Sequence, residues 1–295
     1  MSENNGQSKK DILKDLNAVK TGGKFLTRVV GTNDVFCKES FSDEERMIFE
    51  AMSDYATNEL LPMSQKELNT KDEKLIRKLV EQMGELGFLG VDVPEKYGGS
   101  EMTKTGMCIL AEGISKSGSP SFCTVWNVQT SIGSLGIIWY GNDEQKKRWL
   151  PEISSGKKIA AFGLTEPEAG SDATNSKTTG VLSDDGKHYI LNGQKIFISN
   201  GGWADIFTVA LKIDGKFSSI VVEKGTPGFE IGKEEKKMGM EGSSTVPLYF
   251  TDCKVPVENL LGEVGEGAGP AFCALNIGRF KSVSYTHLTL PTTSA

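Results

Sequence analysis

The sequence predicts an α+β fold: an N-terminal helical domain, a middle antiparallel β domain and the start of a C-terminal helical bundle that is cut short. Two changes of pattern indicate this order. Apolar residues recur at helical spacing up to about residue 157, whereas short apolar runs separated by turn residues fill the stretch from Lys158 to Asp252. A helical pattern returns at 271–281. The 295 residues are enough for about two domains with a sizeable core.

Composition excludes several classes of protein. The net charge of −6 gives no electrostatic reason to expect binding to nucleic acid or to an anionic membrane. No apolar run approaches the roughly 18 residues that a membrane span requires. The five cysteines are scattered without a CxxC pair, so we expect no metal site and a reducing, cytoplasmic setting. Peripheral contact with a membrane is compatible with this for a longer parent protein.

The helical domain is expected to span residues 41–157, after a loosely ordered polar lead-in at 1–40. Its first helix should begin at Ser42, because Ser42 and Glu45 fit a capping box in which each side chain satisfies a free backbone N–H. Apolar residues then follow at helical spacing. We expect this segment to end at Pro62.

Further helices are predicted along the rest of this domain. The clearest has an apolar stripe from Leu75 to Leu86 with charged residues on its other faces. Residues 91–99 contain a proline and paired glycines and should form a loop. The apolar stretch 103–140 is expected to form two buried helices. Asn142 should then cap a short polar helix that ends near Pro151.

The β domain is expected to span residues 158–260. Runs of alternating and β-branched residues are separated by Asp-Gly, Asn-Gly and Pro-Gly turns, a spacing typical of a small antiparallel barrel or sandwich. The predicted strands lie at 158–164, 188–193, 194–200, 205–213, 217–223 and 246–252.

The C-terminal part is expected to be incomplete. Residues 261–281 are consistent with a Gly-rich turn followed by the first helix of a bundle, whereas residues 282–295 are half Ser and Thr and contain Pro291. We expect this tail to be non-native and neither to continue the helix nor to build a domain. Without partner helices the chain should fold poorly on its own, because three apolar residues would face solvent: Phe272, Leu275 and Ile277.

The densest cluster of special residues lies at 162–172, where a strand is predicted to end. Thr165, Ser171 and Asp172 offer side-chain hydrogen bonds, and Gly170 would let a ligand approach the backbone. The same residue types also fit an ordinary polar turn. The sequence contains no GxGxxG motif and no GxxxxGK motif in the required context, so neither a Rossmann nor a Walker phosphate site is supported.

The run LTEPEAGSD at 164–172 resembles the LTEP-x-AGSD signature of the acyl-CoA dehydrogenase family, including its very-long-chain branch. The resemblance extends from about residue 41 to 281. The other matching runs are LGFLGVDVPEKYGG, KIFISNGG, EKKMGM with GSST, CKVPVENLLGEVGEG and NIGRF. The family fold has the same order of helical domain, β domain and four-helix bundle. The resemblance implies FAD as the cofactor, held between the β domain and the bundle.

The resemblance also implies roles for individual residues. The first flavin-contacting segment would comprise Phe162, Gly163, Leu164, Thr165, Gly170 and Ser171. The second would comprise Phe197, Ile198 and Ser199. The substrate contacts would be Ser171, Asn276 and Arg279. Strand alternation would place the Phe197 ring over the flavin and its isoleucine neighbours on the other face, although simple sheet packing also explains this aromatic residue.

Two positions depart from the family pattern. Phe197 stands where relatives often have Trp, which keeps the apolar cover but loses an indole N–H. Glu241 stands where relatives usually carry Lys or Arg, which inverts a charge.

The implied reaction is α,β-dehydrogenation of a fatty acyl-CoA, with long acyl chains favoured. A carboxylate would remove the α proton while the β hydrogen leaves as hydride to FAD. The implied partners are an electron-transferring flavoprotein and further copies of the chain, as in a homodimer. The family's base is a glutamate followed by Gly and Thr. No such motif occurs here, so we assign no catalytic base and expect this fragment to be inactive. An oxidase-like enzyme or a non-catalytic assembly protein remain as alternatives.

Overall fold

The computed structural model describes residues 38–64 and 66–289, and side chains up to residue 283. The chain divides into two compact units, residues 1–43 and 44–295. Within the described part of the first lies the short 3-10 helix η2 (Lys38–Ser40). The predicted lead-in falls mostly outside the described residues. No helix in the described ranges is both long and apolar enough to cross a membrane.

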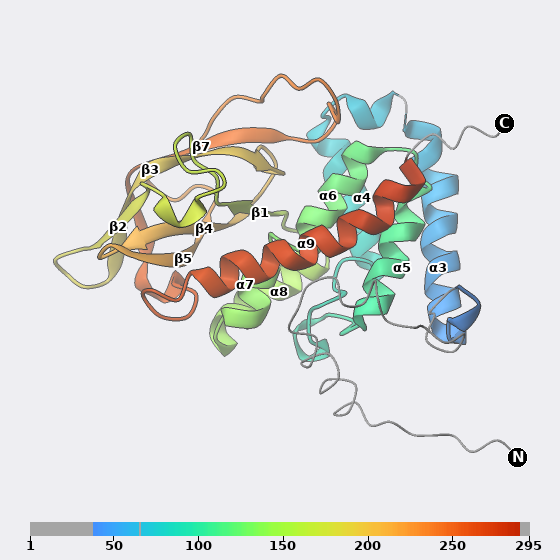
Figure 1. Cartoon of the computed structure of the whole chain (residues 1–295), viewed down its shortest axis with the longest axis horizontal. Helices are drawn as coiled ribbons and strands as arrows, with labels where there is room; N and C mark the ends of the chain where they lie inside the picture. Colours follow the sequence, from blue (N-terminus) through green and yellow to red (C-terminus); the bar gives the residue numbers. More distant parts are fainter. Residues whose placement is uncertain (1–37, 65, 290–295) are drawn as a thin grey trace, which may run out of the picture. The chain divides into compact units, whose positions relative to one another are not determined.

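The second unit contains a group of helices beside one β-sheet (Figure 1). The helices are α3 (Asp43–Tyr55), α4 (Glu73–Glu85), α5 (Lys104–Ser115), α6 (Pro120–Thr130), α7 (Leu135–Tyr140), α8 (Asp143–Ser154) and α9 (Ala268–Thr289). Short helical turns connect them or cap strands: η3 (Ala56–Leu60), η4 (Leu61–Met63), η5 (Glu67–Asn69), η6 (Glu95–Tyr97), η7 (Ala173–Asn175) and η8 (Val257–Asn259).

Helix α4 follows its sequence signals closely. The Asp72 side chain accepts hydrogen bonds from the backbone N–H groups of Lys74 and Leu75, which satisfies two donors that the first turn leaves free. The apolar stripe is buried against the other helices, as its spacing predicts. Its buried residues are Ile76, Leu79, Val80 and Met83.

The stretch 103–140 forms three helices, so the expectation of two was wrong. The extra break lies at Ser131, whose φ of −133° and ψ of −98° are not helical. Gly133 then passes so close to the first strand that an added Cβ would lie 2.9 Å from the backbone carbon of Ala160. This close approach fixes the end of α6 on the sheet.

Helix α8 begins as expected and ends later than expected. Asn142 and Gln145 form a complete capping box. The helix runs through Pro151 to Ser154, because proline removes one hydrogen bond without preventing the next, and Ser155 N–H bonds the Pro151 carbonyl at 3.0 Å. Burial of the last turn against the core outweighs the local signal to stop.

One seven-stranded sheet contains all of the strands found in the described residues. They are β1 (Ala160–Gly163), β2 (Thr179–Leu182), β3 (His188–Ser199), β4 (Ile206–Ile213), β5 (Lys216–Glu223), β6 (Phe229–Ile231) and β7 (Thr245–Pro256). Strand β5 pairs with one edge of β4. Strands β1 and β2 both pair with the other edge of β4 and run parallel to β4. The remaining pairs are antiparallel. The predicted α+β fold is therefore confirmed, with two parallel pairings added to its sheet.

Helix α9 corrects two expectations about the C-terminal part. It continues beyond Lys281 to Thr289, since residues 282–290 contain no Gly or Pro that would interrupt a helix. It packs along α5, α6 and α7 and reaches β5 (Figure 1). The three apolar residues expected to face solvent are therefore half-buried: Phe272, Leu275 and Ile277.

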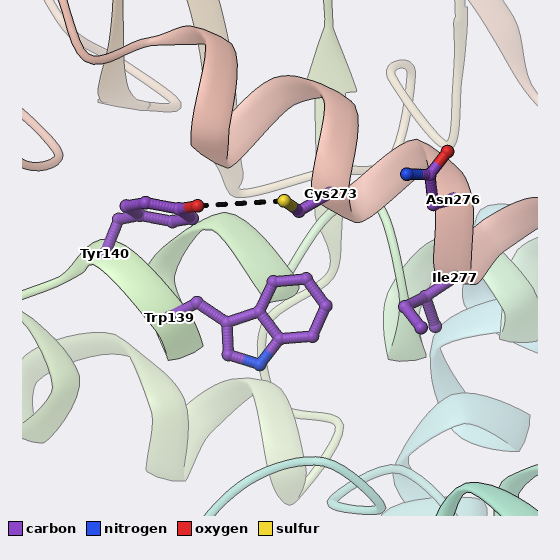
Figure 2. Close-up of a pocket in the computed structure, with 5 residues that line it drawn as sticks. All are labelled: Trp139, Tyr140, Cys273, Asn276 and Ile277. Atoms are coloured by element: carbon purple, nitrogen blue, oxygen red, sulfur yellow. Dashed lines mark hydrogen bonds between the residues drawn. The ribbon is translucent and has the colours of Figure 1, made fainter. Parts of the chain in front are cut away.

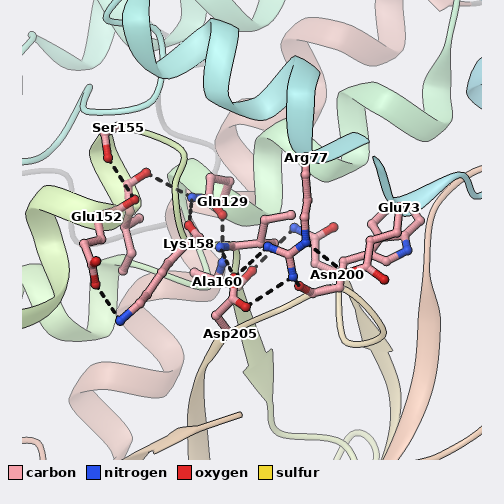
Figure 3. Close-up of polar contacts among 12 residues, drawn as sticks. Glu73, Arg77, Gln129, Glu152, Ser155, Lys158, Ala160, Asn200 and Asp205 are labelled. Atoms are coloured by element: carbon pink, nitrogen blue, oxygen red, sulfur yellow. Dashed lines mark hydrogen bonds and ion pairs between the residues drawn. The ribbon is translucent and has the colours of Figure 1, made fainter. Parts of the chain in front are cut away.

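A polar network joins the helices to the start of β1 (Figure 3). The fully buried Gln129 of α6 donates to the Ile153 and Lys158 carbonyls at 3.0 and 2.9 Å, and accepts from the Ala160 N–H at 2.8 Å. Asn200, in the turn after β3, donates to the Val125 carbonyl at 3.1 Å. These bonds satisfy backbone groups where a helix ends, a turn follows and a strand begins.

Arg77 extends the same network from α4. Its guanidinium contacts both carboxylate oxygens of Asp205 at 3.0 and 3.2 Å (Figure 3). It also donates to the Trp203 carbonyl. Asp205 in turn accepts from the Ile159 N–H at 2.9 Å. This planar, two-pronged contact places the turn that follows β3 beside the strand that opens the sheet.

Candidate cofactor and substrate site

The two segments predicted to contact a flavin lie side by side. The Ile196 N–H of β3 donates to the Thr165 carbonyl at 2.8 Å, just beyond the end of β1. Lys195 reaches the Leu164 carbonyl at 3.2 Å. These two bonds bring together residues that are about thirty positions apart in the sequence.

The first segment divides into a buried and an open part. Phe162, Gly163 and Leu164 are buried, and the Phe162 and Leu164 side chains pack in a small cluster with Ala271 of α9. These residues could therefore meet a ligand only through their backbone. Thr165 is half-buried, and its hydroxyl has no hydrogen-bond partner within the described residues.

Gly170 and Ser171 form the open part of the same loop. Both are exposed, and a Cβ added to Gly170 would meet no atom within 4 Å. The Ser171 hydroxyl has no partner in the part of the chain that the structure describes. This space and the available hydroxyl fit a bound molecule, although none of the described residues requires glycine at position 170.

The second segment turns an aromatic ring outward. Phe197 is 61 % exposed and has a φ of +59°, a backbone conformation that residues other than glycine seldom adopt. The pairing of β3 with β7 is irregular between Lys195 and Ile198. A β-bulge, and not the simple strand alternation that we expected, therefore directs the Phe197 ring outward. Ile198 is buried in the core and Ser199 is half-buried. Strained backbone of this kind is often found at functional sites.

A buried ion pair beneath these segments was not recognised from the sequence. Lys195 Nζ lies 2.6 Å from Glu166 Oε1, and both side chains are almost wholly buried. Burial lowers the pKa of Lys195, because desolvation disfavours its charged form. Burial acts to raise the pKa of Glu166, but hydrogen bonds from Lys195, Thr178 and Lys177 hold it below the usual value. The available signal was a lysine at an inward position of an apolar strand.

The predicted substrate residues lie one turn apart on α9. Asn276 and Arg279 are exposed, and their side chains have no hydrogen-bond partner among the described residues. Asn276 borders a surface pocket of about 540 Å³. Its other lining residues are Trp139, Tyr140, Cys273 and Ile277 (Figure 2). Arg279 lies outside this pocket, and the first turns of α9, rather than these two side chains, pack against the first flavin segment.

Glu241 lies among lysine and glutamate side chains. It lines a polar pocket of about 470 Å³ together with Lys71 and Lys237. Burial and the neighbouring Lys71 lower the pKa of Lys237, while Glu234 and Glu241 act in the opposite direction. The Glu241 carboxylate, like Glu234, therefore favours the charged form of Lys237.

Comparison with known proteins agrees with this geometry. Residues 42–157 match the family model described as acyl-CoA dehydrogenase, N-terminal domain, and residues 161–253 match the model of the middle domain. The chain therefore belongs to the acyl-CoA dehydrogenase family, whose N-terminal and middle domains it contains. A probable acyl-CoA dehydrogenase of Bacillus subtilis is 47 % identical over 264 residues, which are 89 % of this chain and 44 % of that protein.

Two further relatives show the range of the similarity. A crystal structure of an acyl-CoA dehydrogenase complexed with FAD from Bacillus anthracis is 45 % identical, with a TM-score of 0.86 over 90 % of this chain and 45 % of that one. The mitochondrial very long-chain specific acyl-CoA dehydrogenase of Rattus norvegicus is 40 % identical over 255 residues, which are 83 % of this chain and 37 % of that protein. The chain spans less than half the length of these relatives.

Proposed function

We propose that this chain supplies the FAD-contacting surface of an enzyme that dehydrogenates fatty acyl-CoA thioesters between their α and β carbons. One observation carries this proposal. Phe197 presents an exposed ring on a strained bulge, and the two predicted flavin segments adjoin next to it, where the Ile196 N–H bonds the Thr165 carbonyl. The similarity to a dehydrogenase solved with FAD supports the same cofactor here.

The residues present fit such a cofactor. The flavin would supply the acceptor for a hydride. The Phe197 ring would cover an apolar plane, and the hydroxyls of Thr165 and Ser199 would donate hydrogen bonds to polar ring atoms. Hydrogen-bond donors that a folded loop already holds in place do not have to reorient during the reaction. They can therefore stabilise negative charge that develops at the edge of the flavin ring. The bulge at Phe197 would hold the ring outward.

The substrate would lie toward α9. Arg279 offers a permanently charged, planar group suited to phosphate or carboxylate oxygens, which an acyl-CoA provides. Ser171 and Asn276 would add neutral hydrogen bonds. We propose a long-chain substrate on the strength of the similarity to a very long-chain specific relative. An electron-transferring flavoprotein as acceptor, a homo-oligomeric state and a cytoplasmic location complete the proposal.

No base for the α proton is assigned within these 295 residues. The sequence has no Glu-Gly-Thr motif. Glu166 lies in the signature loop but is unsuited to this role, because Lys195 and two backbone N–H groups already occupy its oxygens. We therefore expect the chain by itself to bind cofactor without turning over substrate.

Removal of the two hydroxyls tests the flavin site. Thr165→Ala with Ser199→Ala should weaken FAD binding, because each change removes a hydrogen bond of about 0.5–1.5 kcal/mol net. Titration of the chain with FAD, followed by quenching of flavin fluorescence, measures the loss. Thr124→Ala serves as the control, because it removes a hydroxyl from α6 and should leave the FAD affinity unchanged. Equal FAD affinity in the double variant and the wild-type chain would contradict the assignment of these hydroxyls.

A further inference from the structure

The buried ion pair described above joins both segments of the proposed flavin site. Lys195 precedes Phe197 by two residues on β3, and Glu166 directly follows Thr165. The two side chains are 0 % and 3 % exposed, and their charged atoms lie 2.6 Å apart. One contact therefore ties the loop after β1 to the strand that presents the exposed aromatic ring.

Glu166 also organises its own loop. Its Oε2 accepts from the Lys177 N–H at 2.5 Å, and its Oε1 accepts from the Thr178 N–H at 3.1 Å. Lys195 donates in addition to the Leu164 carbonyl at 3.2 Å. These bonds close the two ends of the segment 164–178, and Gly170 and Ser171 lie between those ends.

Such a pair specifies geometry more than it adds stability. Transfer of two charges into the protein interior carries a large desolvation cost, and well-packed apolar residues in the same space often stabilise a fold equally well. A buried polar network in which every group is hydrogen-bonded, however, favours a single arrangement of its residues. Most of its hydrogen bonds here are made to backbone groups of the loop, so the network fixes the course of the loop.

We propose that Lys195 and Glu166 are positioning residues of the flavin site. The pair holds the 164–178 loop and the Phe197 bulge in the relative placement that a flavin needs, and neither side chain touches the flavin itself. This inference rests on the proposed function. It adds that the binding surface is set from beneath by a pair of buried charges.

Two measurements on the full chain test the proposal. In the FAD-free state, Lys195→Met and Glu166→Gln should speed amide hydrogen exchange at Lys177 and Thr178 by roughly tenfold or more. The same variants should weaken FAD binding by roughly tenfold or more. Lys195→Arg keeps the charge and should recover most of both losses. Lys281→Met replaces another fully buried lysine and should leave these two amides as they are in the wild-type chain.

The outcomes separate the two proposals. Unchanged FAD affinity in both Lys195→Met and Glu166→Gln overturns the positioning role, even where the loop amides exchange faster. Wild-type exchange at the loop amides of these variants overturns it as well, because the loop is then held by other contacts. A wild-type chain that binds no FAD overturns the proposed function itself, and this result is known before any variant is made.

Discussion

Replacement of Gln129 by methionine is expected to lower the free energy of unfolding by about 2 kcal/mol or more. Methionine fills a similar volume but leaves two backbone groups without their hydrogen-bond partner, the Lys158 carbonyl and the Ala160 N–H, whereas the Ile153 carbonyl keeps the Gly156 N–H at 3.2 Å. Each buried group that loses its partner costs about 1–3 kcal/mol. Urea unfolding followed by circular dichroism measures the difference.

Gln82 provides the matched control for this change. It is a half-buried glutamine of α4 whose side chain makes no hydrogen bond within the described residues, so Gln82→Met should stay within about 0.5 kcal/mol of the wild-type chain. A Gln129→Met variant as stable as this control would show that other contacts hold the helices to β1.

The buried Lys281 is expected to make the chain more stable as the pH rises above 7. Its ammonium donates to the Thr130 carbonyl at 2.7 Å and lies 5.4 Å from the Trp126 ring centre. Burial lowers its pKa to about 7, with Asp92 and Cys108 acting to raise it and Lys104 acting to lower it further. The unfolded chain keeps this proton up to about pH 10.4, the ordinary value of lysine.

Between these two values the unfolded chain binds more protons than the folded chain, so stability rises with pH. The slope of a single proton is about 1.4 kcal/mol per pH unit. From pH 7 to 9 the wild-type chain should therefore gain about 2 kcal/mol relative to Lys281→Met, which lacks the group. The comparison cancels the other groups that titrate in this range.

Unfolding in urea at pH 7, 8 and 9 provides the measurement. Lys147→Met serves as a control, because Lys147 is exposed on α8 and its loss should leave the pH dependence of the wild-type chain unchanged. Parallel stability curves for the wild-type chain and Lys281→Met would show that the Lys281 ammonium stays charged in the folded chain across this range.

Local sequence signals predicted most of the helices and strands. Asn142 caps a helix that begins where this cap predicts, and the apolar stripe that begins at Leu75 lies in α4. The misses arise where tertiary contacts override local signals. Pro151 does not end α8 because the turn beyond it is buried. The break after α6 at Ser131 could not be predicted, because it depends on the close approach of Gly133 to Ala160 of β1.

The geometry of the candidate site could be predicted only in part, for similar reasons. The resemblance placed Thr165 and Phe197 in two separate segments, and the structure places these segments side by side. The positive φ of Phe197 could not be predicted, because it depends on the pairing of β3 with β7. The pairing of Lys195 with Glu166 also depends on a contact between segments far apart in the sequence. Residue types alone would have favoured two solvated charges.

Amide hydrogen exchange of the chain with and without FAD tests the central claim most directly. If the account holds, FAD slows exchange in two stretches, 164–171 and 196–199, and leaves β5 and α4 as they were. These stretches carry the backbone groups next to Thr165 and Phe197. Protection confined to another region, such as the polar pocket around Lys71 and Lys237, or no protection at a saturating concentration of FAD, would contradict it.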